Sequence, residues 1–506
     1  MGVSKGMRIL TADEIKKAEE EAINKYFSEA ELMNRAGKKC VDKIVKFYGR
    51  EIDGKRVLVF CGNGKNAGDG FVIAKRLCQF GNHAEIVLCD KEPTLPAPKK
   101  YFDEAVESGV KVTRFTDCNL DCALIVDCVF GIGFHGEPKE PFNSVFNAIN
   151  ESNAIVVSVD IPSGTDASDG SAIHAVRADL TIAISAYKYC HILPPANAYC
   201  GKITAVNIGI PNDCYSESAL TITKTYVKSI FEKRRLNSNK GDFGKQLNIC
   251  GSYSMPGASV ICAESALKTG VGLLKCAFPK SIYGALTAHL TQPVFVPLSE
   301  NEDKTLSMGA LTDILKEIKW ADSIAVGCGI GVNDDTQLLI NQIVKESEVP
   351  VVIDADGINS VSVNIDVLKD SKAPVVLTPH PGEMARLIGK DISFVQKNRI
   401  KCAKAFAMEY GCIVVLKGAN TIVTDGVNVF VNTTGNAGMA MGGTGDMLTG
   451  MIASFIAQRA APFHAAASAV YIHGLCGDIA ARELSQRGMT VDDMLELLGA
   501  LMIEFE

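Results

Sequence analysis

The feature that most constrains the fold is a series of short, almost uninterrupted apolar runs, each followed by a turn and a helical pattern. In the first part of the chain these runs cover residues 56–60, 84–89, 123–129, 154–159 and 180–185. Apolar runs of this length fit strands buried on both faces, which is typical of a parallel sheet covered by helices. The sequence therefore predicts a doubly wound α/β domain.

The same pattern starts again in the second part of the chain, after a polar, lysine-rich stretch at 211–245 that we interpret as a connection between domains. Because 506 residues exceed the size at which one core keeps growing, we expect two domains, 1–222 and 223–506. Their glycine motifs differ, so we predict two unlike three-layer α/β domains. The second series of apolar runs covers residues 247–252, 273–279, 323–329, 349–356, 373–379 and 412–418, and long helical patterns follow at 446–459, 461–486 and 490–503.

Charge and apolar content exclude several classes of protein. The formal net charge is −7 and there is no basic stripe, so a nucleic-acid binder is not expected. No stretch of 18 apolar residues predicts a membrane span, and the first residues do not resemble a signal peptide. The 17 cysteines are scattered, without CxxC pairs or zinc spacing, and we interpret them as reduced, buried side chains. We expect a cytoplasmic homo-oligomer that acts on small molecules.

Three strand ends in the first domain carry polar or glycine-rich sequence. The first runs into CGNGKNAGDGF at 61–71, the next ends in Asp127 before CVFGIGFHGE, and another ends in Asp160 before IPSG. Ligands of doubly wound sheets bind beyond the carboxyl ends of the strands, and a glycine-rich helix start offers N–H donors to phosphate. Each feature alone also fits a structural turn or a helix cap. Together the three predict a ligand site.

The segments GNGKNAGDG, DCVFGIG and SVDIPSG resemble the signature segments of the NAD(P)H-hydrate epimerase domain, or YjeF N-terminal domain, over residues 8–215. The resemblance implies a Rossmann-like fold, a potassium ion held by Asn66, Asp127 and Ser163, and Asp160 at the nicotinamide end of the substrate. Oxygen ligands suit such a hard cation. It also implies that the dinucleotide is lined by Lys65, Asn66, Ala67, Gly68, Asp69, Gly131, Ile132, Gly133, Phe134, His135, Gly136 and Glu137.

Two residues depart from the loop that is usual in this family. Lys65 stands where the family has asparagine, and Ala67 stands where it has glycine. Ala67 is expected to need backbone angles that glycine adopts more easily. Lys65 either contacts a phosphate or weakens the site.

The chemistry expected of Asp160 is proton transfer. The hydrate carries a hydroxyl beside the ring nitrogen, whose lone pair can expel it as water and leave an iminium ion. Water can then return to the other face. One positioned carboxyl group could give the proton and take it back.

The most specific segment is TTGNAGMAMGGTGDMLTG at 433–450, where a glycine-rich turn precedes Asp446 at the start of a helical pattern. Such a turn offers N–H donors and a positive helix end to a phosphoryl group in transfer. Asp446 could accept the proton of the attacking hydroxyl. Asp446 could instead be an acidic residue that only stabilises the helix N-terminus. The dense run of glycines before it favours a functional turn.

This segment is similar to the ribokinase-like superfamily, and with KGDFG (240–244), GCGIG (327–331), DADGIN (354–359), TPHPGEMARL (378–387) and KGANT (417–421) it resembles the NAD(P)H-hydrate dehydratase domain over 230–503. The resemblance implies a ribokinase-like fold, magnesium with ADP or ATP, and Asp446 as general base. Cys328, Ala437 and Met441 depart from the residues that are usual at these positions in the family.

The resemblance also implies the binding residues. It implies that the hydrated nucleotide is held by Gly329, His380, Pro381, Gly382, Glu383, Met384, Ala385, Arg386 and Asp446. It places ADP or ATP on Lys417, Gly418, Ala419, Asn420, Thr421, Asn436, Ala437, Gly438, Met439, Ala440, Met441, Gly442, Gly443, Thr444 and Gly445.

The sequence thus predicts a bifunctional enzyme that epimerises NAD(P)H hydrate and dehydrates its S form. The alternatives are a ribokinase-like small-molecule kinase with a non-catalytic N-terminal domain, or a binding protein whose first domain is inactive. A kinase would release a phosphorylated alcohol, whereas the dehydratase releases phosphate and restores reduced nicotinamide. The choice of ADP or ATP, with ADP favoured, and of NADH or NADPH hydrate stays open. His380, between two prolines, also fits a plain turn, and His464 and His473 are interpreted as structural.

Overall fold

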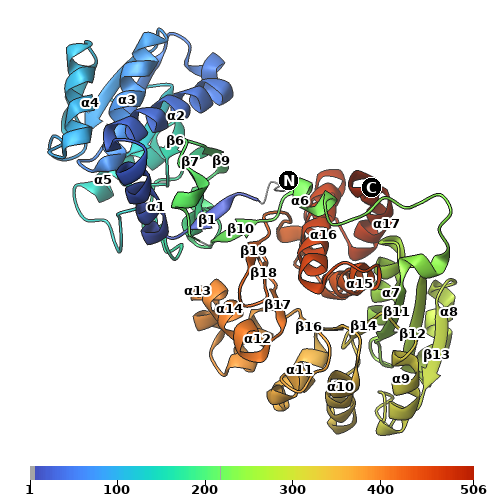
Figure 1. The fold of residues 1–506 in the computed structure, drawn as a ribbon. Coiled ribbons are helices and arrows are strands. Elements are labelled where there is room, and N and C mark those ends of the chain that lie inside the picture. Colours follow the sequence, from blue (N-terminus) through green and yellow to red (C-terminus); the bar gives the residue numbers. More distant parts are fainter. Residues whose placement is uncertain (1–5, 217) are drawn as a thin grey trace. The chain divides into compact units, whose positions relative to one another are not determined.

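The computed structural model describes residues 6–216 and 218–506. They form two compact units, the first Met7–Ser218 and the second Ala219–Glu506 together with Gly6. Figure 1 colours the first unit blue to green and the second green to red. Each unit has a mainly parallel sheet between layers of helices. The predicted α/β class is confirmed for both halves of the chain.

The first unit has seven parallel strands in the order β4-β3-β2-β5-β6-β7-β9. The strand order reverses between β2 and β5, which is where doubly wound sheets bind ligands. Its helices and strands are β1 (Arg8–Leu10), α1 (Ala12–Lys25), α2 (Glu29–Ile52), β2 (Arg56–Cys61), α3 (Lys65–Gln79), β3 (His83–Leu88), α4 (Pro96–Glu107), β4 (Lys111–Arg114), β5 (Leu124–Cys128), α5 (Phe142–Glu151), β6 (Ile155–Val159), β7 (Leu180–Ile184), β8 (Tyr187–Lys188) and β9 (Lys202–Val206).

Successive side chains of a strand point to opposite faces of the sheet, so that helices pack on both faces and make three layers. In β2, Val57 and Val59 face the core shared with α2, α3 and α4, whereas Leu58 and Phe60 face the core shared with α5. Both sets are fully buried, which explains why residues 57–60 are all apolar. Helices α1 and α2 precede β2, and Thr11 forms a capping box with Glu14 at the start of α1.

The second unit repeats this strand order in β13-β12-β11-β14-β15-β16-β17, with the reversal between β11 and β14. Beyond β17 the sheet continues through the antiparallel pairs β17–β18 and β18–β19, and β10 pairs parallel with β19. Its elements are β10 (Ala219–Thr221), α6 (Lys224–Lys228), β11 (Lys245–Ile249), α7 (Pro256–Lys268), β12 (Leu273–Pro279), α8 (Tyr283–His289), β13 (Val294–Leu298), α9 (Leu311–Ile318), β14 (Ser323–Val326), α10 (Asp334–Glu346), β15 (Val351–Ile353), α11 (Asp356–Val363), β16 (Val375–Leu377), α12 (Pro381–Ile388), α13 (Ile392–Lys397), α14 (Arg399–Tyr410), β17 (Ile413–Leu416), β18 (Ile422–Thr424), β19 (Val429–Val431), α15 (Thr444–Ala457), α16 (Pro462–Leu484) and α17 (Val491–Leu501).

Part of the predicted connection at 211–245 is wrong. Residues 219–221 form β10, and α6 follows with Tyr226 and Val227 buried in the core of the second unit. These elements are only three and five residues long, too short for an apolar period to stand out from the polar residues around them. The compact units divide at Ser218 and Ala219, four residues before the end of the predicted first domain.

Packing of α15 on α7 gives a prediction about stability. A Cβ added to Gly450 would lie 2.2 Å from the Cys262 carbonyl oxygen and 2.2 Å from Ser265 Oγ, so the helices could not keep their spacing. Overpacking of this kind costs about 1–3 kcal/mol of unfolding free energy. Gly450→Ala should therefore lower the thermal unfolding midpoint of the C-terminal unit.

The matched control is Gly499→Ala on α17, where an added Cβ meets nothing within 4 Å. Alanine there should leave the midpoint unchanged or raise it, because glycine costs roughly 0.5–1 kcal/mol in a helix interior. Equal midpoints for the two variants would contradict this account of the α7–α15 contact.

Candidate active sites

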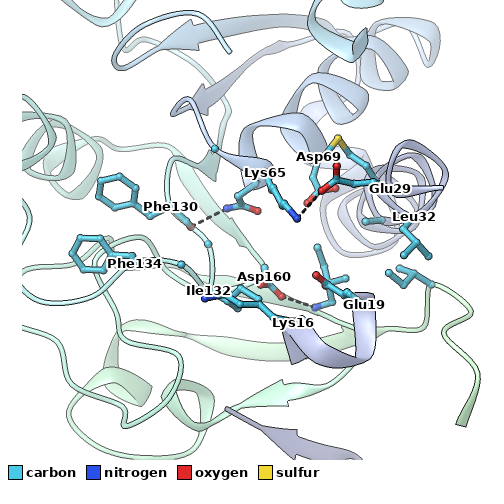
Figure 2. Close-up of a pocket in the computed structure, with 18 of the residues that line it drawn as sticks. Lys16, Glu19, Glu29, Leu32, Lys65, Asp69, Phe130, Ile132, Phe134 and Asp160 are labelled. Atoms are coloured by element: carbon cyan, nitrogen blue, oxygen red, sulfur yellow. Dashed lines mark hydrogen bonds and ion pairs between the residues drawn. The ribbon is translucent and has the colours of Figure 1, made fainter. Parts of the chain in front are cut away.

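The first unit holds a cavity of about 540 Å³ at the reversal between β2 and β5. Asp160 enters it from the end of β6, and α1 and α2 supply its other wall (Figure 2). The cavity is lined by Lys16, Glu19, Glu20, Ile23, Glu29, Leu32, Met33, Ala36, Asn63, Gly64, Lys65, Asn66, Asp69, Val129, Phe130, Gly131, Ile132, Gly133, Phe134, Asp160, Ile184 and Ile208.

The glycine-rich segment after β2 is mostly helix. Gly64 is the N-cap of α3, and no side-chain oxygen caps this helix. Gly64, Lys65 and Asn66 at its start line the cavity. Ala67 lies inside α3, fully buried and without a positive φ angle. The expectation that Ala67 needs backbone angles suited to glycine is therefore wrong, because this position is ordinary helix.

Two glycines of this segment serve packing instead. A Cβ on Gly68 would lie 2.2 Å from Met33 Sδ, and one on Gly70 would lie 2.8 Å from Cys61 Sγ. They let α3 approach α2 and the sheet closely. Gly68 thus lies behind the cavity wall and not on its lining.

Asp160 is held in an uncommon backbone conformation. Its φ is 69°, a left-handed value that is rare for a non-glycine residue. Its Oδ1 accepts hydrogen bonds from the buried ammonium of Lys188 and from the Ile184 N–H at 3.1 Å. His191 Nε2 lies 2.8 Å from the Asp160 carbonyl oxygen, and His191 Nδ1 accepts from the Lys188 N–H at 2.9 Å. Burial lowers the pKa of His191 to about 4, so this imidazole is neutral and donates through Nε2.

Two further carboxyl groups face Asp160 across the cavity. Burial, followed by repulsion from Asp160, raises the pKa of Glu19 to about 7. The same two causes raise the pKa of Asp69 well above its ordinary value. At neutral pH the cavity therefore contains carboxyl groups that can hold a proton beside Asp160.

Asp127 organises the floor of the site. It is fully buried, and its carboxylate accepts four hydrogen bonds from Ser158, Ser163 and Val129 at 2.5–3.2 Å. Asn66 donates to the carbonyl oxygens of Phe130 and Val159, while its own Oδ1 is buried and without a hydrogen-bond partner in the described chain. The three residues predicted to hold potassium thus lie around one carbonyl-rich corner.

The rim of the cavity carries Lys65 and the 130–137 loop. Lys65 Nζ lies 2.6 Å from Glu29 Oε1, with 65% of its side chain exposed. Phe130 stacks on Phe134 with ring centroids 4.7 Å apart. Of the other predicted lining residues, His135 pairs with Asp166 at 2.6 Å, and His135, Gly136 and Glu137 are exposed outside the cavity lining.

In the second unit, three consecutive strands end in polar residues that meet. Asp354 follows β15, Thr378 follows β16 and Lys417 follows β17. Asp354 Oδ1 accepts from Lys417 Nζ at 2.6 Å and from Thr378 Oγ1 at 2.7 Å. Asp354 is 1% exposed, so burial without these donors would be costly. Lys417 and Thr378 together keep the pKa of Asp354 below its ordinary value despite burial.

The glycine-rich turn and α15 cover this ion pair. Gly443 is the N-cap of α15 with φ of 92°, which favours glycine. A Cβ on Gly445 would lie 3.2 Å from Asp354 Oδ2 and 3.3 Å from Lys417 Nζ, so glycine lets the helix start rest on the pair. Asp446 follows in the first turn. Burial, with repulsion from Cys328 and Asp354, raises its pKa to about 9.

The predicted His380–Arg386 segment is the start of α12. His380 is its N-cap, and its Nδ1 accepts from the Gly382 N–H at 3.0 Å and the Glu383 N–H at 3.3 Å. Burial, then the charge of Lys417, lowers the pKa of His380, and burial raises the pKa of Glu383 to about 7. Arg386 donates to Asn359 Oδ1 at 2.6 Å. His380 therefore caps a helix beside the Lys417–Asp354 pair.

Asp478, which was not predicted from the sequence, holds the start of the 435–445 segment by hydrogen bonds. Asp478 on α16 accepts from the Gly435 N–H at 2.9 Å and from Asn436 Nδ2 at 3.1 Å. Asn436 Oδ1 in turn accepts from the Gly438 N–H at 2.9 Å. Thr444 Oγ1 donates to the Met441 carbonyl at 3.1 Å. Side chains thus hold both ends of this turn.

Other site residues were also missed. Glu19 and Lys188 lie outside any recognisable motif. Asp354 lies inside DADGIN, and its position directly after an apolar run is the same signal that identified Asp127 and Asp160.

In the part of the chain that the structure describes, none of the helices combines the length and the apolar content that a membrane span requires.

Two protein families match the two halves of the chain. Residues 29–190 match the family described as YjeF-related protein N-terminus, and residues 247–499 match the family described as NAD(P)H-hydrate dehydratase. These matches fall on the parts of the chain that contain the two sites. The order of the families agrees with the order predicted from the motifs.

Relatives match over almost the whole chain. The bifunctional NAD(P)H-hydrate repair enzyme Nnr of Moorella thermoacetica is 32% identical, covering 99% of this chain and 97% of that protein. The enzyme of the same name from Escherichia coli is 31% identical, covering 97% and 93%. A ribokinase-like superfamily protein from Enterococcus faecalis is 26% identical, with a TM-score of 0.50, covering 56% of this chain and 95% of that one, which confirms the ribokinase-like fold. The chain therefore belongs to the family of bifunctional NAD(P)H-hydrate repair enzymes.

Proposed function

We propose that the chain repairs hydrated NAD(P)H in two steps, one in each unit. The first unit interconverts the R and S forms, and the second dehydrates the S form with ADP or ATP, which yields NAD(P)H, AMP or ADP, and phosphate. Membership in the repair family supports both activities over a small-molecule kinase. The observation that carries the proposal is that each strand-end site presents one aspartate, Asp160 or Asp446, beside groups that control its charge.

In the epimerase step Asp160 stands at the reacting carbon. The ring nitrogen expels the hydroxyl as a proton arrives, which leaves water and an iminium ion. Water then adds to the opposite face and loses a proton. Lys188 balances the charge of Asp160 through Oδ1, so the other carboxylate oxygen is left to exchange protons with the leaving and entering water.

Glu19 is suited to supply the proton that this exchange needs. Its pKa of about 7 leaves it partly protonated at neutral pH, and it lines the same cavity as Asp160. Efficient proton transfer favours a group whose pKa lies near the working pH. We therefore assign Glu19 as a proton donor to the Asp160 site.

A potassium ion fits the corner formed by Asn66, Asp127 and Ser163. Asn66 Oδ1 is buried without a hydrogen-bond partner in the described residues, and Asp127 is a buried carboxylate with only neutral donors around it. Oxygen ligands of this kind suit a hard cation. When bound, the ion supplies positive charge next to the loop of Phe130.

The diphosphate of the dinucleotide is expected at the start of α3. Its uncapped amides and positive end attract an anion, and Lys65 adds a positive charge at the rim. Lys65 can leave Glu29 for a phosphate at little cost, because surface ion pairs contribute only about 0–1 kcal/mol. Lys65 is thus compatible with substrate binding.

In the dehydratase step Asp446 accepts the proton of the substrate hydroxyl as its oxygen attacks the terminal phosphorus of the nucleotide. The new P–O bond replaces the bond to the bridging oxygen, which leaves with AMP or ADP. The ring nitrogen then expels phosphate, and loss of the neighbouring ring proton restores NAD(P)H. The glycine turn supplies amide donors for the moving phosphoryl group.

Magnesium is expected with the nucleotide, because it binds mainly phosphates and water and needs few protein ligands. When bound, it neutralises charge on the phosphates. The Lys417–Asp354 pair lies directly beneath Gly445 and so fixes the position of the turn. The preference for ADP, the homo-oligomer and the cytoplasmic location stay predictions.

The first test of the epimerase assignment is Asp160→Asn. With a mixture of both hydrate forms, ADP and magnesium, the unaltered protein should convert all hydrate to reduced nicotinamide. Asp160→Asn should consume the S form and leave the R form, because loss of such a group lowers the rate about 10²- to 10⁴-fold. Chromatography of the hydrates measures this. Unchanged R-to-S interconversion would remove Asp160 from the mechanism.

Asp446→Asn should give the reciprocal result. Recovery of reduced nicotinamide absorbance should fall about 10²- to 10⁴-fold, while the R and S forms still equilibrate. The persistence of epimerisation is the internal control for folding. Near-normal dehydration by this variant would overturn the role of Asp446 as general base.

The pH dependence of dehydration follows from the pKa of Asp446. A base with a pKa of about 9 is mostly protonated at neutral pH, so kcat/KM should rise about tenfold per pH unit from about pH 6 to about pH 8 and level off near pH 9. The residual rate of Asp446→Asn should lack this rise. A flat profile for the unaltered protein would contradict Asp446 as the base.

A further inference from the structure

Three cysteines meet beneath the dehydratase site, although they are far apart in the sequence. Cys250 directly follows β11, Cys328 lies two residues after β14, and Cys262 lies on α7. β11 and β14 are neighbours at the strand-order reversal, and the Gly251 N–H donates to the Cys328 carbonyl at 2.8 Å. All three side chains are fully buried. The fold therefore places three thiols at the point where sheets of this type bind ligands.

The spacing of the sulfurs matches that of a metal site. All three Sγ atoms lie within 4.8 Å of one another, and Cys250 Sγ is 4.0 Å from Cys262 Sγ. A Zn–S bond of about 2.3 Å separates neighbouring sulfurs by about 3.8 Å in a tetrahedral site and by about 4.0 Å in a planar one. Shifts of a few tenths of an ångström would therefore suffice to close the three thiols around an ion.

Two carboxyl groups lie next to one thiol of the cluster, that of Cys328. Cys328 Sγ and carboxylate oxygens of Asp354 and Asp446 lie within 4.8 Å of one another. Asp354 is already bound by Lys417 and Thr378, whereas Asp446 lies at the partly exposed start of α15. Asp446 is therefore the carboxyl group beside Cys328 that Lys417 and Thr378 do not bind.

The donor atoms of the cluster are three sulfurs. Thiolates select zinc-like, soft cations over magnesium or potassium. The donor set thus differs in kind from the oxygen-rich sites expected for the cofactors of this enzyme.

We propose that Cys250, Cys262 and Cys328 form a binding site for a thiophilic divalent cation such as Zn²⁺ or Cd²⁺, completed by Asp446. Binding displaces the thiol protons and ties the Asp446 carboxylate to the ion. The inhibitory part of this proposal rests on Asp446 acting as the dehydratase base, whereas the binding part does not. The first unit and its epimerase site are unaffected.

The binding test is a Cd²⁺ titration of the reduced, metal-free full-length protein. One Cd²⁺ per chain should produce the ultraviolet charge-transfer absorbance of a cadmium–thiolate site. Cys262→Ala and Cys328→Ala should each lose this absorbance. Cys276→Ala is the matched control, because Cys276 is also fully buried in the second unit but lies outside the cluster, and it should keep the absorbance.

The folding of each variant is checked by its retained R-to-S interconversion and its thermal unfolding midpoint. Two variants on different elements, α7 and the β14 end, keep the test decisive if one of them fails to fold. Equal Cd²⁺ absorbance in the unaltered protein and in a folded Cys262→Ala or Cys328→Ala variant would overturn the proposed site.

The inhibition test uses Zn²⁺ during dehydration and epimerisation. Zn²⁺ at ten times its dissociation constant should lower dehydration about tenfold, as mass action requires if the bound form is inactive. Epimerisation should continue, and Cys262→Ala should dehydrate at the same rate with and without Zn²⁺. Cd²⁺ binding without loss of dehydration would remove Asp446 from the site, while equal inhibition of Cys262→Ala would place the inhibitory ion elsewhere.

Discussion

Burying a carboxylate costs free energy unless a cation or several hydrogen-bond donors satisfy it, and this constraint organises both sites. Asp127 meets it with hydrogen bonds from Val129, Ser158 and Ser163. Asp160 meets it with Lys188, and Asp354 meets it with Lys417 and Thr378. Each of these hydrogen bonds or ion pairs joins one strand end to a neighbouring strand or loop. The same contacts that make burial tolerable therefore hold the walls of the sites in place.

Glycine serves two different physical purposes in the two sites. In the second unit, Gly443 provides a left-handed turn and Gly445 lets α15 rest on the Lys417–Asp354 pair. In the first unit, Gly68 and Gly70 have ordinary helical angles and allow α3 to approach α2 and the sheet. Similar glycine-rich patterns thus serve close packing alone in the first unit, and both backbone conformation and close packing in the second.

The sequence predicts the central strands of both sheets, their parallel pairing, and Asp127 and Asp160 at strand ends. These follow from local apolar runs and from the rule that ligands bind beyond the carboxyl ends of parallel strands. It does not predict Glu19 or Lys188, which reach Asp160 from a helix and from a short strand distant in the chain. Nor does it predict that Cys250, Cys262 and Cys328 meet, because their proximity depends on strand order and not on spacing. Scattered cysteines could only be interpreted as separate buried side chains, and β10 and α6 were too short to show an apolar period.

The two units share one strand order but place their key aspartates in opposite electrostatic surroundings. Asp160 has the buried ammonium of Lys188 bonded to it. At Asp446 the nearby ammonium of Lys417 is bonded to Asp354 instead, and burial leaves Asp446 with a pKa of about 9. A carboxylate in that position is a strong base once ionised, as removal of a hydroxyl proton during phosphoryl transfer requires. In the proposed mechanism, the pairing of each carboxylate, more than the fold around it, therefore separates epimerisation from dehydration.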